Sequence, residues 1–247
     1  MKKRRIRSYP KPRWLVWGSR FLVICLLFFG LILTFNQEIQ KVLMQNQSHA
    51  VYHKHVSASE IKKNQKKKAS FDFQAVKPVS LDAVIKNQLS STNLPTIGKV
   101  AIPSVNIGLP ILKGLANENL LVGAGTLAED QVMGERNYAL ASHRMFDESL
   151  LFTPLDHLKI GEKIYITDLT TIFIYQSFNN LKVDPHRIDL LNDPLPDQKP
   201  MITLITCGEM AGETRRIVQG ELVETLPFET APDEIKQVFT MSITPHL

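Results

Sequence analysis

Cys207 is the residue whose position most strongly suggests chemistry. It ends the β-branched run "MITLITC", and a thiolate there could attack a carbonyl if one neighbour favoured the ionised thiol and another stabilised the oxyanion. His143, at the end of the apolar run "NYALASHRM", is the histidine placed to assist, and Arg215 and Arg216 follow Cys207 after a turn. Each also has an ordinary interpretation: a buried thiol, a satisfied structural histidine and two solvated arginines.

The elements around Cys207 predict how these groups meet. "MITLIT" and "RIVQGELVETL" both alternate as strands, and the turn "GEMAGET" joins them. Antiparallel neighbours have their near ends side by side, so Cys207 should face Arg215 or Arg216. Arg216 shares a strand face with apolar Val218, whereas Arg215 shares one with Gln219. Alternation therefore favours Arg215 for a groove on the outer surface.

The chain from Leu81 onward has the sequence pattern of an all-β domain. Short apolar runs of four to eight residues are broken by Pro, Gly, Asn and Asp, which is typical of a small barrel or sandwich. Helices should be few and short, at residues 80–88, 116–123 and 148–158 and in the tail "APDEIKQVF". With 247 residues and 44% hydrophobic composition, one well-buried domain with appendages is expected.

Charge is distributed unevenly along the chain. The formal net charge is +5, but residues 1–20 alone contribute eight basic residues and no acidic one. Residues 81–247 carry 13 basic and 21 acidic side chains, a net charge of −8. The folded part is therefore acidic, which argues against a nucleic-acid partner.

The N-terminus has the pattern of a membrane signal-anchor. A basic segment, residues 1–13, precedes a 22-residue apolar stretch, residues 14–35, long enough to cross a bilayer as a helix. Trp14 and Trp17 fit an interfacial belt, and the basic residues place the N-terminus in the cytoplasm. A cleaved signal peptide is the competing interpretation, but no small-x-small cleavage site follows. Cys25 would lie within the membrane as a small apolar side chain.

Residues 36–80 are polar and rich in Lys, Ser and Asn, and predict an extracytoplasmic stalk with some helix. His53 and His55 could bind a metal weakly, but no further ligand lies near them in the sequence. Cys207 is then the single cysteine outside the membrane, either a buried bystander or a free reactive thiol.

The motifs together resemble the sortases, membrane-bound cysteine transpeptidases of Gram-positive bacteria. The resemblance rests on "TLITC", "RRIVQG", "ALASHRM" and "IPSVNIGLPILKG", and spans about residues 95–225. It implies that residues 81–247 form an eight-stranded sortase-type β-barrel in which His143, Cys207 and Arg215 converge. A single N-terminal anchor, no C-terminal span and no evident lid upstream of the barrel are most similar to class A enzymes.

The resemblance also implies a reaction. The substrate would be a secreted protein with a C-terminal Leu-Pro-x-Thr-Gly signal, cut between Thr and Gly through a Cys207 thioester. In class A the acceptor is an amine of a peptidoglycan precursor, so surface proteins become attached to the cell wall. The other expected partner is membrane lipid, and the expected location is the cell membrane with the catalytic domain outside.

The loop "NLKVDPHRIDLLND" resembles the sorting-signal loop of the family. Positions implied to bind the Leu-Pro end are Ile188, Leu190 and Leu191 in this loop and Ala141, Ile205 and Thr206 on the strands. Each could instead be ordinary core. The calcium-binding cluster of some members cannot be placed on Glu129, Asp130 or Glu135, so no metal and no cofactor are assigned.

Three alternatives remain open. A papain-like protease would also use Cys and His, but its cysteine precedes its histidine and begins a helix, whereas here the order is reversed. A non-catalytic, membrane-tethered β-barrel binding module would have no need of thiol, imidazole and guanidinium together. A pilus-polymerising sortase would share the chemistry but usually has a lid and a C-terminal span.

Overall fold

The computed structural model describes residues 13–90 and 94–240. The chain divides into two compact units, residues 1–39 and residues 40–247. The first contains all of helix α1 (Arg13–Thr34). The helices that belong wholly or largely to the second are α2 (Asn36–His53), α3 (Ala58–Gln65), α4 (Leu81–Ser90), α5 (Asn117–Leu120) and α6 (Asp233–Gln237), with short 3₁₀ turns η1 (Phe73–Ala75), η2 (Pro103–Val105), η3 (Thr153–His157) and η4 (Ile188–Leu191).

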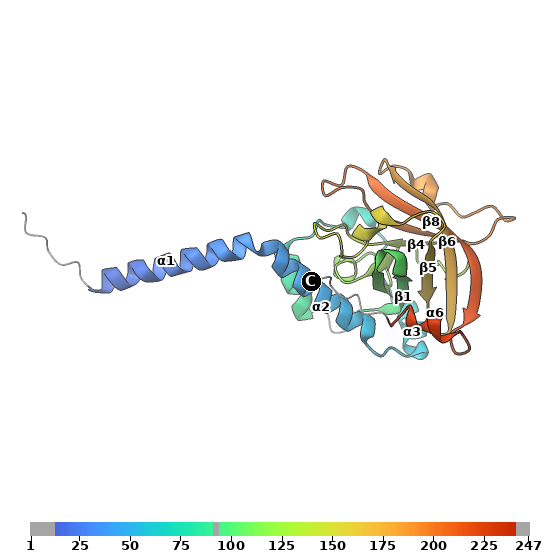
Figure 1. Ribbon diagram of the computed structural model, residues 1–247, viewed down its shortest axis with the longest axis horizontal. Helices are drawn as coiled ribbons and strands as arrows, with labels where there is room; N and C mark the ends of the chain where they lie inside the picture. Colours follow the sequence, from blue (N-terminus) through green and yellow to red (C-terminus); the bar gives the residue numbers. More distant parts are fainter. Residues whose placement is uncertain (1–12, 91–93, 241–247) are drawn as a thin grey trace, which may run out of the picture. The chain divides into compact units, whose positions relative to one another are not determined.

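Eight strands of the second unit form a closed barrel with the order β1-β2-β3-β4-β7-β8-β6-β5 (Figure 1). They are β1 (Thr96–Ile102), β2 (Ile107–Leu112), β3 (Ala124–Thr126), β4 (Asn137–Ala141), β5 (Lys163–Thr167), β6 (Thr171–Val183), β7 (Met201–Cys207) and β8 (Arg215–Pro227). The pairs β2–β3 and β4–β7 are parallel and the others antiparallel. Closure leaves no strand edge free, and the predicted all-β barrel is confirmed.

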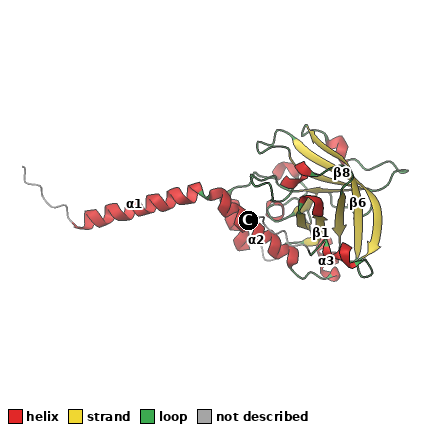
Figure 2. Ribbon diagram, in the orientation of Figure 1, coloured by secondary structure: helices red, strands yellow, loops and turns green. Residues whose placement is uncertain are grey.

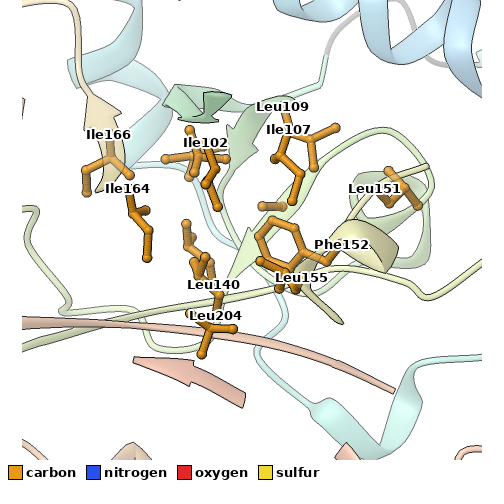
Figure 3. Packing of buried hydrophobic residues seen from close by; sticks show 14 of the residues in the cluster. Ile102, Ile107, Leu109, Leu140, Leu151, Phe152, Leu155, Ile164, Ile166 and Leu204 are labelled. Carbon is orange, nitrogen blue, oxygen red and sulfur yellow. The ribbon is translucent and has the colours of Figure 1, made fainter. Parts of the chain in front are cut away.

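Side-chain alternation builds the core of this barrel. Tyr138 and Leu140 of β4, Leu204 of β7 and Val218 of β8 point inward and are buried in one continuous cluster. Figure 3 shows Phe152 and Leu155, from the connection between β4 and β5, packed in the same cluster as Leu140 and Leu204. The opposite faces of β4, β7 and β8 are thereby left outward, where a groove can form.

Residues 40–65, within the segment predicted as a stalk, pack against the barrel. Met44 of α2 belongs to the main core cluster, and Tyr52 of α2 lies under the Lys99 ammonium, 4.5 Å from the ring centroid. Asn64 of α3 donates from Nδ2 to the Thr96 carbonyl at 2.9 Å. Figure 2 shows the helices of this unit around the yellow strands. A few apolar and amide side chains at helical spacing therefore suffice to dock a segment that is polar on average.

The N-terminal helix exposes its apolar side chains within its own unit; Phe21, for example, is 70% exposed. Across residues 13–90 and 94–240, no single helix combines the length and apolar composition expected of a membrane span. Arg20–Leu31 and Asn36–His53 meet that requirement only as a pair, joined at a sharp bend. The basic residues predicted to precede the span lie mostly in residues 1–12, outside the described residues.

Candidate active site

The predicted site lies at one end of three neighbouring strands. In the parallel pair β4–β7, Ala141 is opposite Ile205, and the Ser142 amide extends the pairing by donating to the Ile205 carbonyl at 3.1 Å. His143 therefore leaves β4 beside Cys207. In the antiparallel pair β7–β8, Cys207 is directly opposite Arg215. The barrel order β4-β7-β8 thus places the thiol between the imidazole and the guanidinium.

The turn between β7 and β8 brings the thiol and the guanidinium to one space. The Gly208 amide donates to the Thr214 carbonyl at 2.9 Å, and Gly212 has a φ of +73°. A methyl group added at Gly212 would lie 4.0 Å from Cys207 Sγ and 3.9 Å from Arg215 Nη1. A side chain at Gly212 would be strained and would enter the gap between the two reactive groups.

The Arg215 side chain is held in place by hydrogen bonds, but not all of its N–H donors have a partner in the part of the chain that the structure describes. Its Nη1 donates to the Gly212 carbonyl at 2.7 Å and to the Thr214 carbonyl at 3.0 Å. Its Nε is buried and has no hydrogen-bond partner among the described residues. Because an unmet buried donor is costly, this N–H favours an acceptor supplied by a substrate. A carbonyl oxygen that gains negative charge is such an acceptor.

His143 is half-buried, and its burial lowers the pKa to about 4. Desolvation disfavours the charged imidazolium, so the ring is neutral at physiological pH. A neutral imidazole can accept the proton of the Cys207 thiol and later deliver it to a leaving amine. The ring is therefore suited to general acid–base catalysis.

Within the described residues, Arg216, unlike Arg215, forms an ion pair with a carboxylate. It donates from Nε to Asp156 Oδ1 at 2.7 Å, and Arg144 bonds the other carboxylate oxygen while its Nη1 donates to the Cys207 carbonyl at 3.5 Å. Burial by itself would raise the pKa of Asp156, but the two arginines lower it, so the carboxylate is ionised. This network fixes the backbone beneath Cys207 and leaves Arg215 as the arginine on the groove side.

A cavity of about 580 Å³ extends from Arg215 along the outer faces of β4, β7 and β8. Its apolar lining includes Ile188 and Leu191 of η4, Ile205 of β7 and Ile217 of β8. Ile188 is 70% exposed, as is typical of an apolar side chain awaiting a partner. A hollow with apolar strand walls that ends at the unmet donor of Arg215, which pairs with Cys207 across β7 and β8, can bind an extended peptide.

Three of the six predicted binding positions do not line this cavity. Thr206 points into the barrel because adjacent strand residues face opposite ways, and Ala141 is covered by Leu115 and Leu120. Leu190 contributes its backbone carbonyl to a hydrogen-bond network instead. The strand position that does face the cavity is Ala139, two residues before Ala141.

That network holds the loop over the cavity. Gln219 of β8 donates from Nε2 to the Leu190 carbonyl at 3.0 Å, and Asn137 of β4 donates from Nδ2 to the Asn192 carbonyl at 3.1 Å. Thr203 of β7 donates to Asn137 Oδ1 at 2.8 Å. Three adjacent strands thus each supply one polar side chain that positions η4. These residues were missed from the sequence, where isolated polar positions in strands are read as solvent-facing.

An upstream segment also reaches the site, contrary to the expectation that no lid precedes the barrel. Phe71 and Phe73 line the cavity, and the Arg215 guanidinium lies 5.6 Å from the Phe73 ring centroid. The Leu115 amide anchors this segment by donating to the Ser70 carbonyl at 2.7 Å. The sequence signal was available: two phenylalanines interrupt a run of Lys and Ser.

The acidic residues considered for calcium are engaged elsewhere. Asp130 pairs with Arg136 at 3.0 Å, and Glu129 lies 3.9 Å from Lys113. Among the described residues, no group of three or more His, Cys, Asp or Glu side chains could hold a metal ion.

Comparison with known proteins places this geometry in a family. Residues 100–223 match the sortase domain. The chain is 41% identical over 233 residues to sortase A of Streptococcus agalactiae, covering 92% of this chain and 91% of the relative. It is 38% identical over 208 residues to sortase A of Listeria monocytogenes, covering 84% of this chain and 92% of the relative.

Solved structures agree with the sequence matches. The crystal structure of Listeria monocytogenes sortase A is similar with a TM-score of 0.53 and 36% identity, covering 58% of this chain and 96% of that one. Sortase C-3 of Streptococcus pneumoniae, at 21% identity and a TM-score of 0.58, covers 81% of this chain and all of its own length and shares the fold. The chain belongs to the sortase family, whose members are cysteine transpeptidases.

Proposed function

We propose that this protein is a class A sortase that cleaves Leu-Pro-x-Thr-Gly signals between Thr and Gly and joins the Thr carbonyl to a peptidoglycan-precursor amine. The observation that carries the proposal is the pairing of Cys207 with Arg215 at the end of β7 and β8, next to the strand that His143 follows, with Arg215 also lining a cavity. The two sortase A relatives, each matched over more than four fifths of this chain, support the class.

The reaction follows from the side chains. Neutral His143 accepts the Cys207 proton as the sulfur attacks the Thr carbonyl carbon, and Arg215 donates hydrogen bonds to the oxyanion. The C–N bond to Gly breaks when His143 returns the proton to the leaving amine, which leaves a Cys207 thioester. An acceptor amine then loses a proton to His143, attacks the thioester carbon and releases the thiol.

The apolar cavity is suited to the Leu-Pro end of the signal. Ile188, Leu191 and Ile205 offer aliphatic surface to a leucine side chain and a proline ring, neither of which brings a charge. Because the cavity ends at Arg215, a peptide with its Leu-Pro end under η4 has its Thr carbonyl near Cys207.

The proposal includes a membrane anchor. Residues 1–13 would be cytoplasmic and residues 14–35 would span the membrane, with the catalytic unit outside. The basic block followed by a 22-residue apolar stretch supports this arrangement. An extracellular location also brings the enzyme to secreted substrates and to cell-wall precursors.

A peptide assay on the full-length chain in detergent tests the proposal. A fluorogenic Leu-Pro-x-Thr-Gly peptide should be cleaved by the wild type and not by Cys207→Ala, and an added amine should yield a transpeptidation product. An intact peptide with folded wild-type protein would contradict the sortase A assignment. A pilus-type signal cleaved in preference would favour the polymerising class instead.

A further inference from the structure

A second cavity, of about 270 Å³, lies at His143 and is separate from the apolar one. His143 lines this cavity, whereas Arg215 lines the first, and Cys207 is between them in strand order. An acyl chain on Cys207 that occupies the first cavity leaves the His143 side of the thioester open. The imidazole that must deprotonate an incoming amine thus faces a hollow of its own.

The walls of this cavity come from outside the barrel strands. They are residues 77–87, which include most of α4, and residues 117–121, which include α5. The Lys77 amide donates to Asn117 Oδ1 at 2.8 Å, and Asn87 Nδ2 donates to the Glu118 carbonyl at 3.2 Å. Val84 and Leu121 are buried in the core. The two wall segments are therefore held to each other and to the barrel.

The rim of the cavity carries both signs of charge. Asp82 and Glu118 supply exposed carboxylates, and Lys77 and Lys86 supply ammonium groups. The Ser80 side chain bonds to Asp82 and lowers its pKa, so that carboxylate is charged. The first cavity also has charged residues at its rim, among them Asp184, Arg187 and Asp193, but its wall on the strands is apolar at Ala139, Ile205 and Ile217. The rim of the cavity at His143 complements a ligand that carries an ammonium and an anionic group within a few bonds of each other.

We propose that the cavity lined by Lys77, Asp82, Lys86, Glu118 and His143 is the acceptor site, which binds a peptide with a primary amine and a nearby anionic group. This inference rests on the proposed transpeptidase function. The carboxylates attract the ammonium form of the acceptor, which loses one proton to solvent. His143 takes a second proton as the nitrogen attacks the thioester and passes it to the departing Cys207 sulfur. Lys77 holds the anionic part of the same molecule and so orients the amine.

The test compares two acceptors on the full-length chain in detergent. Dialanine carries the amine and the carboxylate that the rim would recognise, while hydroxylamine is too small to span it. In Asp82→Asn/Glu118→Gln, we expect the KM for dialanine to rise five- to tenfold. Hydrolysis of the sorting peptide without amine and its reaction with hydroxylamine should stay within twofold of wild type. The matched control, Glu224→Gln/Glu234→Gln, removes two exposed carboxylates that line neither cavity and should change nothing.

An unchanged dialanine KM in the double variant would overturn the acceptor site. So would an equal fall in hydrolysis and in both amine reactions, since that pattern indicates a general structural effect. Raised ionic strength should increase the dialanine KM of wild type more than that of the double variant, and equal increases would count against the proposal.

A binding measurement separates this inference from the proposed function. Dialanine added to the wild type without sorting peptide should shift the His143 ring signals in NMR, and the double variant should need a five- to tenfold higher concentration for the same shift. Equal concentrations in both proteins would overturn the acceptor site. Failure of the wild type to cleave the sorting peptide would contradict the proposed function alone.

Discussion

The cavity lined by Arg215 and the cavity lined by His143 are built from different parts of the chain. The apolar one is built mainly on β4, β7 and β8, whose pairing fixes Ile205, Ile217 and Arg215 on one outer face. The charged one at His143 is walled by residues 77–87 and 117–121, which are joined to each other by the Lys77–Asn117 hydrogen bond and to the core by Val84 and Leu121. The barrel strands thus set the nucleophile and its acyl substrate, while appended segments shape the side from which a second substrate arrives.

The largest expected effect comes from comparing Arg215 with Arg216, which lie on opposite faces of β8. Arg215→Ala should lower kcat/KM for the sorting peptide by about 10²–10³, because the oxyanion loses its donor. Arg216→Ala should instead reduce stability, since Asp156 would keep only Arg144. Peptide kinetics and thermal unfolding of both variants give the comparison. Equal losses of activity with equal Tm values would contradict the division of roles.

The polar residues under η4 should affect substrate binding rather than chemistry. Gln219→Leu removes the donor to the Leu190 carbonyl and loosens Ile188 and Leu191. We expect KM for the sorting peptide to rise about tenfold, the effect of roughly 1.4 kcal/mol, with kcat little changed. Gln219→Glu, which keeps the side chain's size but not the donor, should behave like the leucine variant. A fall in kcat at constant KM would argue against a positioning role.

The upstream segment should have a smaller influence on the apolar cavity. Phe73→Ala removes the ring beside Arg215, a contact that contributes about 0.5–1 kcal/mol at an exposed site. In this variant the sorting peptide does not have to displace the Phe73 ring from the cavity. We therefore expect the KM for the sorting peptide to fall two- to fivefold. Phe146→Ala, at a ring that is also exposed but lines neither cavity, is the matched control. A raised KM would mean that Phe73 binds the substrate instead of competing with it.

A separate prediction concerns the pH dependence of stability that arises from His143. Its folded pKa of about 4 lies below the unfolded value near 6.5, so the unfolded chain binds the proton first as pH falls. The proton therefore costs no stability well above pH 6.5, and the free energy of unfolding falls as the pH drops from about 6.5 to 4, by about 2 kcal/mol at pH 5. His143→Gln should lose less Tm from pH 7 to pH 5 than wild type. Parallel Tm curves would show that the folded imidazole is not held neutral.

The sequence predicted the strand-borne part of the molecule well, for a physical reason. Period-two alternation places Arg215 and Arg216 on opposite faces, and the turn after Cys207 sets the pairing of Cys207 with Arg215. Predicted helices at 80–88 and 116–123 correspond to α4 and α5, while 148–158 forms only the 3₁₀ turn η3. These features depend on local pattern, which a single sequence contains.

Other features depend on tertiary contacts that no local pattern records. The polar average of residues 36–80 obscured Met44, Tyr52 and Ile61, each of which is buried against the rest of the unit. Ala139 and Ala141 share a strand face, so alternation cannot distinguish them. In the structure, Leu120 of α5 covers Ala141, whereas Ala139 lines the cavity. The charged cavity needs segments about 40 residues apart, joined by the Lys77–Asn117 hydrogen bond, and so appears only in three dimensions.

The central claim is that Cys207 forms the covalent intermediate, and mass spectrometry of the intact protein tests it most directly. Full-length wild type mixed with a Leu-Pro-x-Thr-Gly peptide should gain the mass of the peptide through Thr, located on Cys207 by digestion. Dialanine should remove that mass and release the peptide joined to dialanine. Cleaved peptide with no adduct on Cys207, or an adduct that persists when amine is added, would contradict the account.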